Sequence, residues 1–250
     1  MKLRWNPLQS LKKEGILTGC DDKQEWMLKW WWKNYSKQNT FPVTFFDFGM
    51  SKSARLWCEN RGSVIPLHLS DSIIADKSQV TRPWSITTTD FAWSKRKAWF
   101  SKPLSLLKTP YQKTVWLDID CRVKGNLESL FAFCEKAEGL ALGREIPARA
   151  TSEKAAGLVP DQGICYNTGV IAFMHRSPLI ENWARHAFFN NQEALGDQDL
   201  LSRLLFEGHH TPYELPSIYN RIHPEPDTSD VLIYHHASLA GKMSIEVTHG

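Results

Sequence analysis

Two acids stand one residue apart near the middle of the chain, at the end of an apolar segment. The segment reads VWLDID and ends in Asp118 and Asp120. Residues i and i+2 of an extended segment point to the same side, and two carboxylates that face one another repel. A divalent cation removes this repulsion, and oxygen ligands suit Mg²⁺ or Mn²⁺ bound together with substrate phosphates. The pair therefore predicts a binding site for a metal ion and a diphosphate. The alternative is that the two acids are ordinary turn formers at the end of a strand.

A second group of polar residues follows the last apolar segment of the chain. The sequence VLIYHH ends in His235 and His236, and Lys242 comes shortly after them. A single histidine is more often structural than a ligand. A histidine pair that ends a strand and precedes a cation is more typical of a site. From the residues alone, both histidines are candidates for this site.

Apolar segments alternate with segments of helical periodicity along the chain. We expect strands at about 16–19, 41–49, 63–67, 113–118, 164–174 and 231–236. We expect helices at about 22–38, 51–62, 91–107, 177–190 and 197–208, and loops at 68–90 and 144–163, the second loop being the best candidate for a mobile segment. The alternation indicates βαβ units and a mainly parallel sheet in one domain. Ligands bind beyond the carboxyl ends of such strands, where Asp118 and Asp120 lie.

The composition limits the class of protein and its partners. The chain has 250 residues, of which 42% are hydrophobic and 23% charged, and a formal charge of +3. These values are those of an ordinary globular protein, and without a long Lys/Arg run they give no indication of nucleic acid. The five cysteines are scattered and never spaced C-x-x-C, which favours a reducing compartment over a disulfide framework or a zinc site.

The ends of the chain and its apolar segments bear on its location. No segment has the pattern of a signal peptide or the unbroken apolar length of a membrane span. We therefore expect a cytoplasmic protein without a transmembrane segment. The basic residues and tryptophan in MKLRW, at the start, leave peripheral contact with the inner face of a membrane as an alternative to a solvated leader.

Two classes of enzyme place a D-x-D motif at a strand end. Phosphatases of the haloacid dehalogenase type have it on the first strand, before a Gly–Thr-like pair, with the first Asp as nucleophile. Here the motif comes after more than a hundred residues and continues into Cys121, Arg122 and Val123, so the phosphatase fits poorly. Nucleotide-sugar transferases have the motif in the middle of the chain, after a nucleotide-binding βαβ half, as found here.

Short segments spread over about 16–242 occur in the order of a known family. They read ILTGCDD, LDID, YNTGVIAF, GDQDLL, LPSIYN and HHASLAGK. In these segments the chain resembles the metal-dependent retaining glycosyltransferases of the glycogenin and lipopolysaccharide galactosyltransferase group, family eight, which have a GT-A fold. The resemblance implies a Rossmann-like α/β domain over 1–250 with a mainly parallel mixed sheet. Its nucleotide-binding half would be about 16–120, and its donor-sugar and acceptor half 121–250.

The resemblance also implies roles for single residues. The residues expected to contact the nucleotide-sugar are Gly19, Asp21, Lys102, Asp118, Gly169 and Lys242. The expected metal ligands are Asp118, Asp120 and His236. The residues expected to act near the anomeric carbon are Asp197, Gln198 and Asn167. The LPSIYN segment ends at Asn220.

The last segment departs most from the family pattern. His236 stands six residues before Lys242, as the family spacing asks, but Leu239 replaces the usual glycine and no Pro-Trp follows the lysine. His235 therefore competes with His236 as the ligand, and we favour His236.

Several of these residues also have purely structural interpretations. Asn167 could bond a neighbouring loop, and Asp197 could be the N-cap of the helix that starts there, a role that still faces the cleft. Lys102 could be a solvated helix residue, because only its spacing of sixteen residues from Asp118 argues for a site.

The function implied is transfer of a sugar from a nucleotide-sugar to an unknown hydroxyl acceptor, expected to be a glycan, with retention of the anomeric configuration. UDP is the expected nucleotide, and Mn²⁺ or Mg²⁺ the expected cofactor. A metal-dependent phosphatase or nucleotide-sugar hydrolase that uses Asp118 and Asp120 is the alternative enzyme. A non-catalytic protein that binds a sugar or nucleotide is the third hypothesis.

Overall fold

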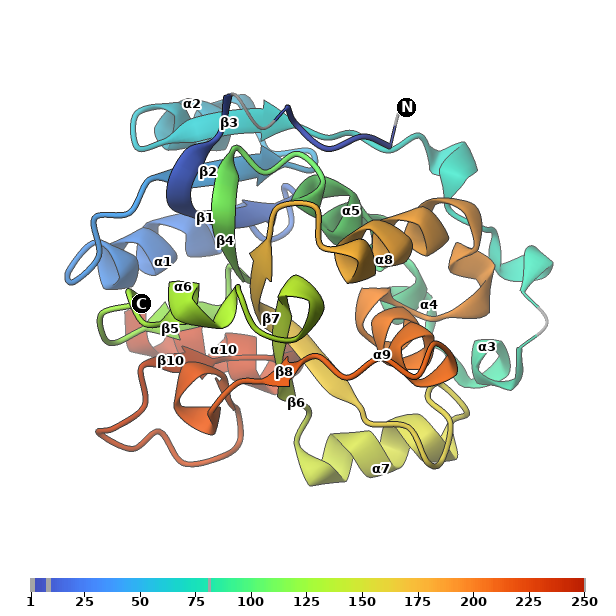
Figure 1. Cartoon of the computed structure of the whole chain (residues 1–250). Helices are drawn as coiled ribbons and strands as arrows, with labels where there is room; N and C mark the ends of the chain where they lie inside the picture. The colour runs from blue at the N-terminus through green and yellow to red at the C-terminus, as the bar shows by residue number, and fades with distance from the viewer. Residues whose placement is uncertain (1–2, 8–9, 81, 250) are drawn as a thin grey trace.

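Seven strands form the central sheet in the order β3-β2-β1-β4-β7-β6-β8. The computed structural model describes residues 3–7, 10–80 and 82–249, so the outermost ends of the expected domain, 1–2 and 250, lie outside it. The strands of this sheet are β1 Lys12–Cys20, β2 Val43–Asp47, β3 Ser63–Pro66, β4 Tyr111–Leu117, β6 Leu140–Arg144, β7 Tyr166–Met174 and β8 Tyr213–Glu214. Figure 1 shows them from β3 at the upper left to β8 at the lower middle of the molecule.

The sheet is mixed and mainly parallel. β1 pairs in parallel with β2 and β4, β2 pairs in parallel with β3, and β6 with β8. β7 runs antiparallel to both of its neighbours, β4 and β6. The expected α/β architecture with a mainly parallel mixed sheet is confirmed.

Helices cover both faces of the sheet because neighbouring residues of each strand point to opposite faces. Ile16 and Val115 pack in one core with α1, whereas Leu17 and Trp116 pack in the other with α5 and α8. Figure 1 shows α5, α8 and α9 on one side of β4 and β7, and α1 and α6 on the other. The helices are α1 Leu28–Tyr35, α2 Lys52–Glu59, α3 Pro83–Thr87, α4 Asp90–Trp93, α5 Arg96–Leu106, α6 Leu130–Phe133, α7 Pro147–Ala155, α8 Pro178–Phe189, α9 Asp197–Glu207 and α10 Ser238–His249. Within the described ranges, none of them is long and apolar enough to cross a membrane.

A second, three-stranded sheet lies beside the first and has the order β5-β10-β9. Its strands are β5 Cys121–Val123, β9 Arg221–Ile222 and β10 Ile233–His235. β10 pairs antiparallel with β5, and this register sets His235 opposite Cys121. The backbone N–H of His236 also donates to the carbonyl of Asp120, at 3.0 Å. The small sheet therefore brings the histidine pair beside the acid pair.

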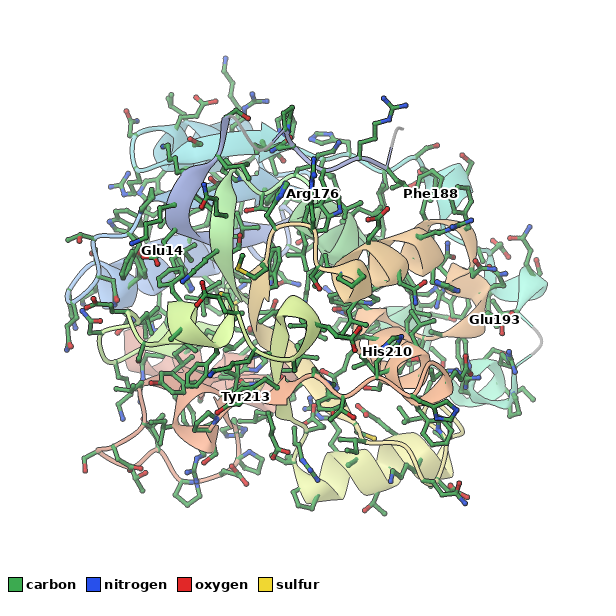
Figure 2. The ribbon with its side chains drawn as sticks, in the orientation of Figure 1. Glu14, Arg176, Phe188, Glu193, His210 and Tyr213 are labelled. Carbon is green, nitrogen blue, oxygen red and sulfur yellow. The ribbon has the colours of Figure 1, made fainter. Side chains whose placement is uncertain are left out.

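Two segments expected to be loops contain helices. The 144–163 segment forms α7, which begins with Pro147 at its first turn and ends before Gly157, with Ala, Glu, Lys and Arg favouring the helix between them. The 68–90 segment contains α3 and two short 3₁₀ helices, at Asp71–Ile73 and Lys77–Gln79. Next to α3, Arg82 forms an ion pair with Glu193, which follows α8 and is labelled in Figure 2.

Candidate active site

Two adjoining cavities open at the carboxyl ends of β1 and β4. The larger has a volume of about 540 Å³ and the smaller about 70 Å³. Both are lined by Gln24, Trp99, Lys102, Asp118, Asp120 and Lys242. The larger cavity also brings in Asn167, Asp197, Gln198 and His235, and the smaller Gly19 and Asp21. Most of the residues singled out in the sequence thus surround one continuous space.

Lys102 sits between two acids that are far apart in the sequence. Its Nζ lies 3.0 Å from Oδ1 of Asp118 and 3.1 Å from Oδ2 of Asp197. It also donates to the carbonyl and hydroxyl oxygens of Thr168, each at 3.2 Å. Trp116 completes the cluster because its Nε1–H donates to Oδ1 of Asp118 at 2.7 Å. The lysine is therefore a buried part of the site and not a solvated helix residue.

Opposite charges surround the buried ammonium group of this cluster. Burial alone would lower the pKa of Lys102, but Asp118 and Asp197 beside it raise that pKa above its ordinary value. For Asp197, burial raises the pKa and the neighbouring Lys102 only partly opposes it. Asp197 is the first residue of α9, after Gly196 as N-cap, and Trp183 Nε1–H donates to its carbonyl oxygen at 2.9 Å.

Asp120 faces the imidazole of His235 and the ammonium group of Lys242. Nε2 of His235 lies 3.3 Å from its Oδ1, and Nζ of Lys242 lies 3.3 Å from its Oδ2. Nε2 of His235 is also 3.9 Å from Oδ2 of Asp118. Burial would raise the pKa of Asp120, but Lys242 and His235 hold that pKa below its usual range. The carboxylate is therefore ionised and ready to bind a cation.

His236 points elsewhere. Its Nδ1 lies 2.9 Å from Oγ of Ser244 and 3.2 Å from the carbonyl oxygen of Gly241, and its ring meets Trp30 and Tyr234 edge-on. Burial, with Arg122 nearby, lowers the pKa of His236 to about 4, so the ring is neutral. The structure places the imidazole of His235, and not that of His236, against both acids.

The residues present fit a divalent cation. Nε2 of His235 lies 3.3 Å from Oδ1 of Asp120 and 3.9 Å from Oδ2 of Asp118, and carboxylate oxygens suit Mn²⁺ or Mg²⁺. Among the described residues, the group whose potential ligand atoms all lie within 4.8 Å of one another is Asp120, Cys121 and His235, without Asp118. Burial raises the pKa of the Cys121 thiol, which donates to the carbonyl of Gly169 at 3.5 Å, so Cys121 is a poor ligand.

A hydrogen-bonded network orders the far wall of the larger cavity. The buried carboxylate of Glu145 accepts from Asn167 Nδ2 and from Gln198 Nε2, each at 2.9 Å. Gln198 Nε2 also donates to Oε1 of Glu153 at 3.0 Å. Asn220 joins the network by donating to Oδ1 of Asn167 at 3.0 Å. The predicted residues Asn167, Gln198 and Asn220 therefore come together around Glu145.

Two acids near this network are held partly protonated near neutral pH. Burial and the nearby Glu145 raise the pKa of Glu153 to about 7. Burial likewise raises the pKa of Asp199 to about 7, although its carboxylate accepts the N–H groups of Leu195 and Gly196 at 2.8 and 2.7 Å. Perturbed carboxyl groups beside a cavity are typical of functional sites.

The smaller cavity has a different lining. Gly19 lies so close to Phe46 and Phe48 that an added Cβ would meet each at 2.9 Å, and Oδ1 of Asp21 accepts the N–H of Lys23 at 3.1 Å. Phe48 also stacks on Trp116, with ring centroids 6.4 Å apart. A flat, partly apolar group with polar edges suits this space.

Sequence reasoning missed several residues of the site. Thr168 lies within the YNTGVIAF segment, between the predicted site residues Asn167 and Gly169, but it was not itself predicted to belong to the site. Glu145, Arg149 and Glu153 lie in the segment expected to be a loop, where neither a motif nor a periodicity marks them. Only the alternation of Pro, Ala and charged residues over 147–155 could have indicated the helix that carries two of them.

Comparisons with known proteins give a likeness in structure alone. No family model matches the chain, and no curated protein is significantly similar to it in sequence. Among solved structures, galactosyltransferase LgtC in complex with donor and acceptor sugar analogues has a TM-score of 0.57 at 15% identity, over 90% of this chain and 88% of that one.

Two further structures give the same fold. Mouse xyloside xylosyltransferase 1 has a TM-score of 0.57 at 16% identity, over 90% of this chain and 97% of its own. The glycosyltransferase GlyE of Streptococcus pneumoniae TIGR4 has a TM-score of 0.57 at 18% identity, over 92% of this chain and 55% of its own. The chain therefore shares the GT-A fold of these glycosyltransferases.

Proposed function

We propose that this protein is a metal-dependent glycosyltransferase that moves a sugar from a nucleotide-sugar, with UDP as the nucleotide, to a hydroxyl acceptor with retention of the anomeric configuration. The observation that carries the proposal is the meeting of Asp118, Asp120, His235 and Lys242 in one cavity at the carboxyl edge of a GT-A sheet. The half over about 16–120 would bind the nucleotide, and 121–250 the sugar and acceptor.

Asp118, Asp120 and His235 would hold the metal ion. Once bound, Mn²⁺ or Mg²⁺ supplies the positive charge that stabilises a departing nucleoside diphosphate. Lys242 is 30% exposed and lines both cavities, so it is the cation free to turn from Asp120 toward a phosphate. Lys102 is different, because Asp118 and Asp197 already neutralise it. We assign Lys102 to positioning these two acids.

The far wall would hold the donor sugar. Glu145 fixes the amides of Asn167 and Gln198, which then present defined donors and acceptors to sugar hydroxyls. Asp197, anchored by Lys102 and by the Thr168 hydroxyl at 2.9 Å, would face the anomeric carbon. Gly19 and Asp21 in the smaller cavity would receive the base and ribose, next to Phe48 and Trp116.

The place of the acid pair in the fold makes the phosphatase alternative less suitable. The pair follows β4, after more than a hundred residues, whereas phosphatases of the haloacid dehalogenase type have it on the first strand. We therefore keep transfer as the proposed reaction.

The cysteines support a reducing compartment. Cys20, Cys58, Cys121, Cys134 and Cys165 are all free and buried. Free buried thiols are usual where proteins stay reduced, so we propose a cytoplasmic location.

The test is a panel of nucleotide-sugars with Mn²⁺, with Mg²⁺ and with a chelator, with release of the nucleoside diphosphate as the readout. We expect one donor to be cleaved slowly even without acceptor, only with metal, and we expect Asp120→Asn to lower the rate about 10- to 100-fold. Asp71→Asn, whose side chain is 93% exposed, is the matched control and should be unchanged. Cleavage that survives the chelator, or a phosphoenzyme on Asp118, would contradict the proposal.

A further inference from the structure

The mouth of the larger cavity carries a concentration of exposed apolar side chains. Among the described residues, the large hydrophobic side chains with high exposure are Trp26, Leu56, Ile86, Phe91, Phe189, Leu239 and Met243. Four of these seven line this one cavity: Trp26 (42% exposed), Phe91 (61%), Leu239 (64%) and Met243 (56%). We call these four residues the apolar rim. Apolar side chains gathered at one place on a surface mark an interaction site.

The rim is assembled from three separate elements. Trp26 lies on the 3₁₀ helix Glu25–Met27, Phe91 on α4, and Leu239 and Met243 on α10. Leu239 and Met243 are four residues apart, so they stand on the same face of α10. The chain therefore directs apolar side chains to the cavity mouth from segments that are remote in sequence.

The rim lies outside the polar groups assigned to the donor. Asp118, Asp120 and Lys242 are shared by both cavities, so the diphosphate position lies where the cavities join. The base side is the smaller cavity with Phe48 and Trp116, and the sugar side is the wall of Asn167 and Gln198. The rim is the exposed apolar part of the cavity lining, and none of its four residues has been assigned to the donor.

The side-chain types favour an alkyl chain over a sugar ring at the rim. Sugar rings stack on flat aromatic faces, which Trp26 and Phe91 could offer. Leu239 and Met243 have no such face, and they gain free energy only when apolar atoms cover them. A second copy of the chain on the rim would close the entrance of the cavity. The occupant that satisfies both the apolar side chains and an open cavity is an acceptor with its own apolar part.

We infer that the apolar rim binds an amphiphilic acceptor, in which an alkyl chain lies on Trp26, Phe91, Leu239 and Met243 while the hydroxyl-bearing head group enters the cavity. This inference names the acceptor class of the proposed transferase and rests on that proposed function. Lys23 and Lys95 line the same cavity, and Nζ of Lys95 lies 5.0 Å from the centre of the Phe91 ring. The apolar face is thus bordered by ammonium groups that stay in water.

The experiment measures binding and needs no turnover. Methyl, hexyl, octyl and decyl β-maltosides, each below its critical micelle concentration, are titrated calorimetrically into the full chain in the presence of UDP and Mn²⁺. We expect the affinity to rise about two- to fourfold for each added methylene, as burial of alkyl surface requires. The double variant Leu239→Ser, Met243→Ser should lose most of that dependence on chain length.

Leu56→Ser is the control, because Leu56 is 58% exposed on α2 and does not line the cavity. This variant should keep the wild-type dependence of affinity on alkyl chain length. Equal affinity for methyl and decyl maltoside, or an equal loss in Leu56→Ser, would overturn the inference.

Two other occupants of the apolar rim, a bilayer and a second copy of the chain, would give different results. Binding to vesicles of phosphatidylcholine and phosphatidylglycerol that requires Leu239 and Met243, without a chain-length effect on monomeric maltosides, would assign the rim to a bilayer and overturn the inference. A dimer that dissociates in the double variant would assign it to a second copy and do the same. The panel of nucleotide-sugars with the wild-type chain tests the proposed function separately, because alkyl binding is measured without any donor being cleaved.

Discussion

The imidazole of His235 lies directly over Gly169, so that a Cβ added to this glycine would come within 2.1 Å of Cε1 and 2.4 Å of Nδ1 of the ring. Such distances require the ring to move. Gly169 thus has a role that the resemblance did not imply: it leaves room for the imidazole that faces Asp118 and Asp120. We expect Gly169→Ala to displace His235 and to weaken Mn²⁺ binding about 10- to 100-fold, measured by metal titration of donor cleavage.

A double-mutant cycle separates this clash from general damage. If Gly169→Ala acts by moving His235, the double variant with His235→Ala should bind Mn²⁺ no more weakly than His235→Ala alone. Additive losses in the cycle would show that Gly169 acts by another route. Circular dichroism of each variant checks that the fold is kept.

The two adjacent histidines should respond differently to removal. We expect His235→Ala to raise the Mn²⁺ concentration that donor cleavage requires by about 10- to 100-fold, because it removes the imidazole that faces both acids. His236→Ala should keep the apparent affinity for Mn²⁺ but lower the melting temperature, because it removes the contacts to Ser244, Trp30 and Tyr234. The reverse result would restore the assignment of His236 as the ligand.

Which of these two histidines faces the acids could not be predicted from the sequence. Successive side chains of a strand point to opposite sides, so a shift of one residue in pairing exchanges the two rings. The antiparallel register sets His235 opposite Cys121, and it brings the imidazole of His235 within 3.3 Å of Asp120. Neither residue type nor family spacing contains that register. By contrast, the position of Asp118 and Asp120 followed from the apolar strand before them, because a parallel sheet gathers ligands at that edge.

The charge clusters needed the tertiary structure for the same reason. Lys102 was selected only by its distance along the chain from Asp118, and the fold adds Asp197 as its second partner. Glu145 and Glu153 had no signal of their own, because their role comes from Gln198, which another helix brings to them. The sheet and the site's position could thus be predicted from local patterns, whereas pairings between distant elements could not.

Removing the charge of Lys102 should destabilise the fold. Its side chain is 9% exposed, and Lys102→Met would leave Asp118 and Asp197 without their shared cation. Breaking a buried ion pair by removing one partner costs about 3–5 kcal/mol in the free energy of unfolding. Denaturant unfolding measures this loss. Lys97→Met is the control on the same helix, because its partner Asp71 is exposed and the pair contributes about 0–1 kcal/mol. Equal losses would show that Lys102 has no special electrostatic role.

The stability of the protein should depend on pH through Glu153. The pKa of Glu153 is raised from 4.5 to about 7, so between these values the folded protein keeps a proton that the unfolded chain releases. The free energy of unfolding contributed by this group therefore falls as the pH rises from 4.5 to 7 and stays constant above that. Glu153→Gln cannot titrate, and its melting temperature should fall less over this range than that of the wild type.

The measurement is the melting temperature of wild type and Glu153→Gln from pH 4.5 to 8. Asp199, whose pKa is also raised to about 7, titrates in both proteins, and because its charge helps to raise the pKa of Glu153, the difference between the two curves reports on this pair of acids. Glu207→Gln, an exposed residue at the end of α9, is the matched control and should follow the wild type. The amide oxygen introduced by Glu153→Gln can still accept from Gln198, but its NH₂ group replaces Oε2, which is buried without a hydrogen-bond partner. The comparison is therefore of the slope of the melting temperature with pH and not of its absolute value. Parallel curves for wild type and Glu153→Gln would show that Glu153 is ionised throughout this range.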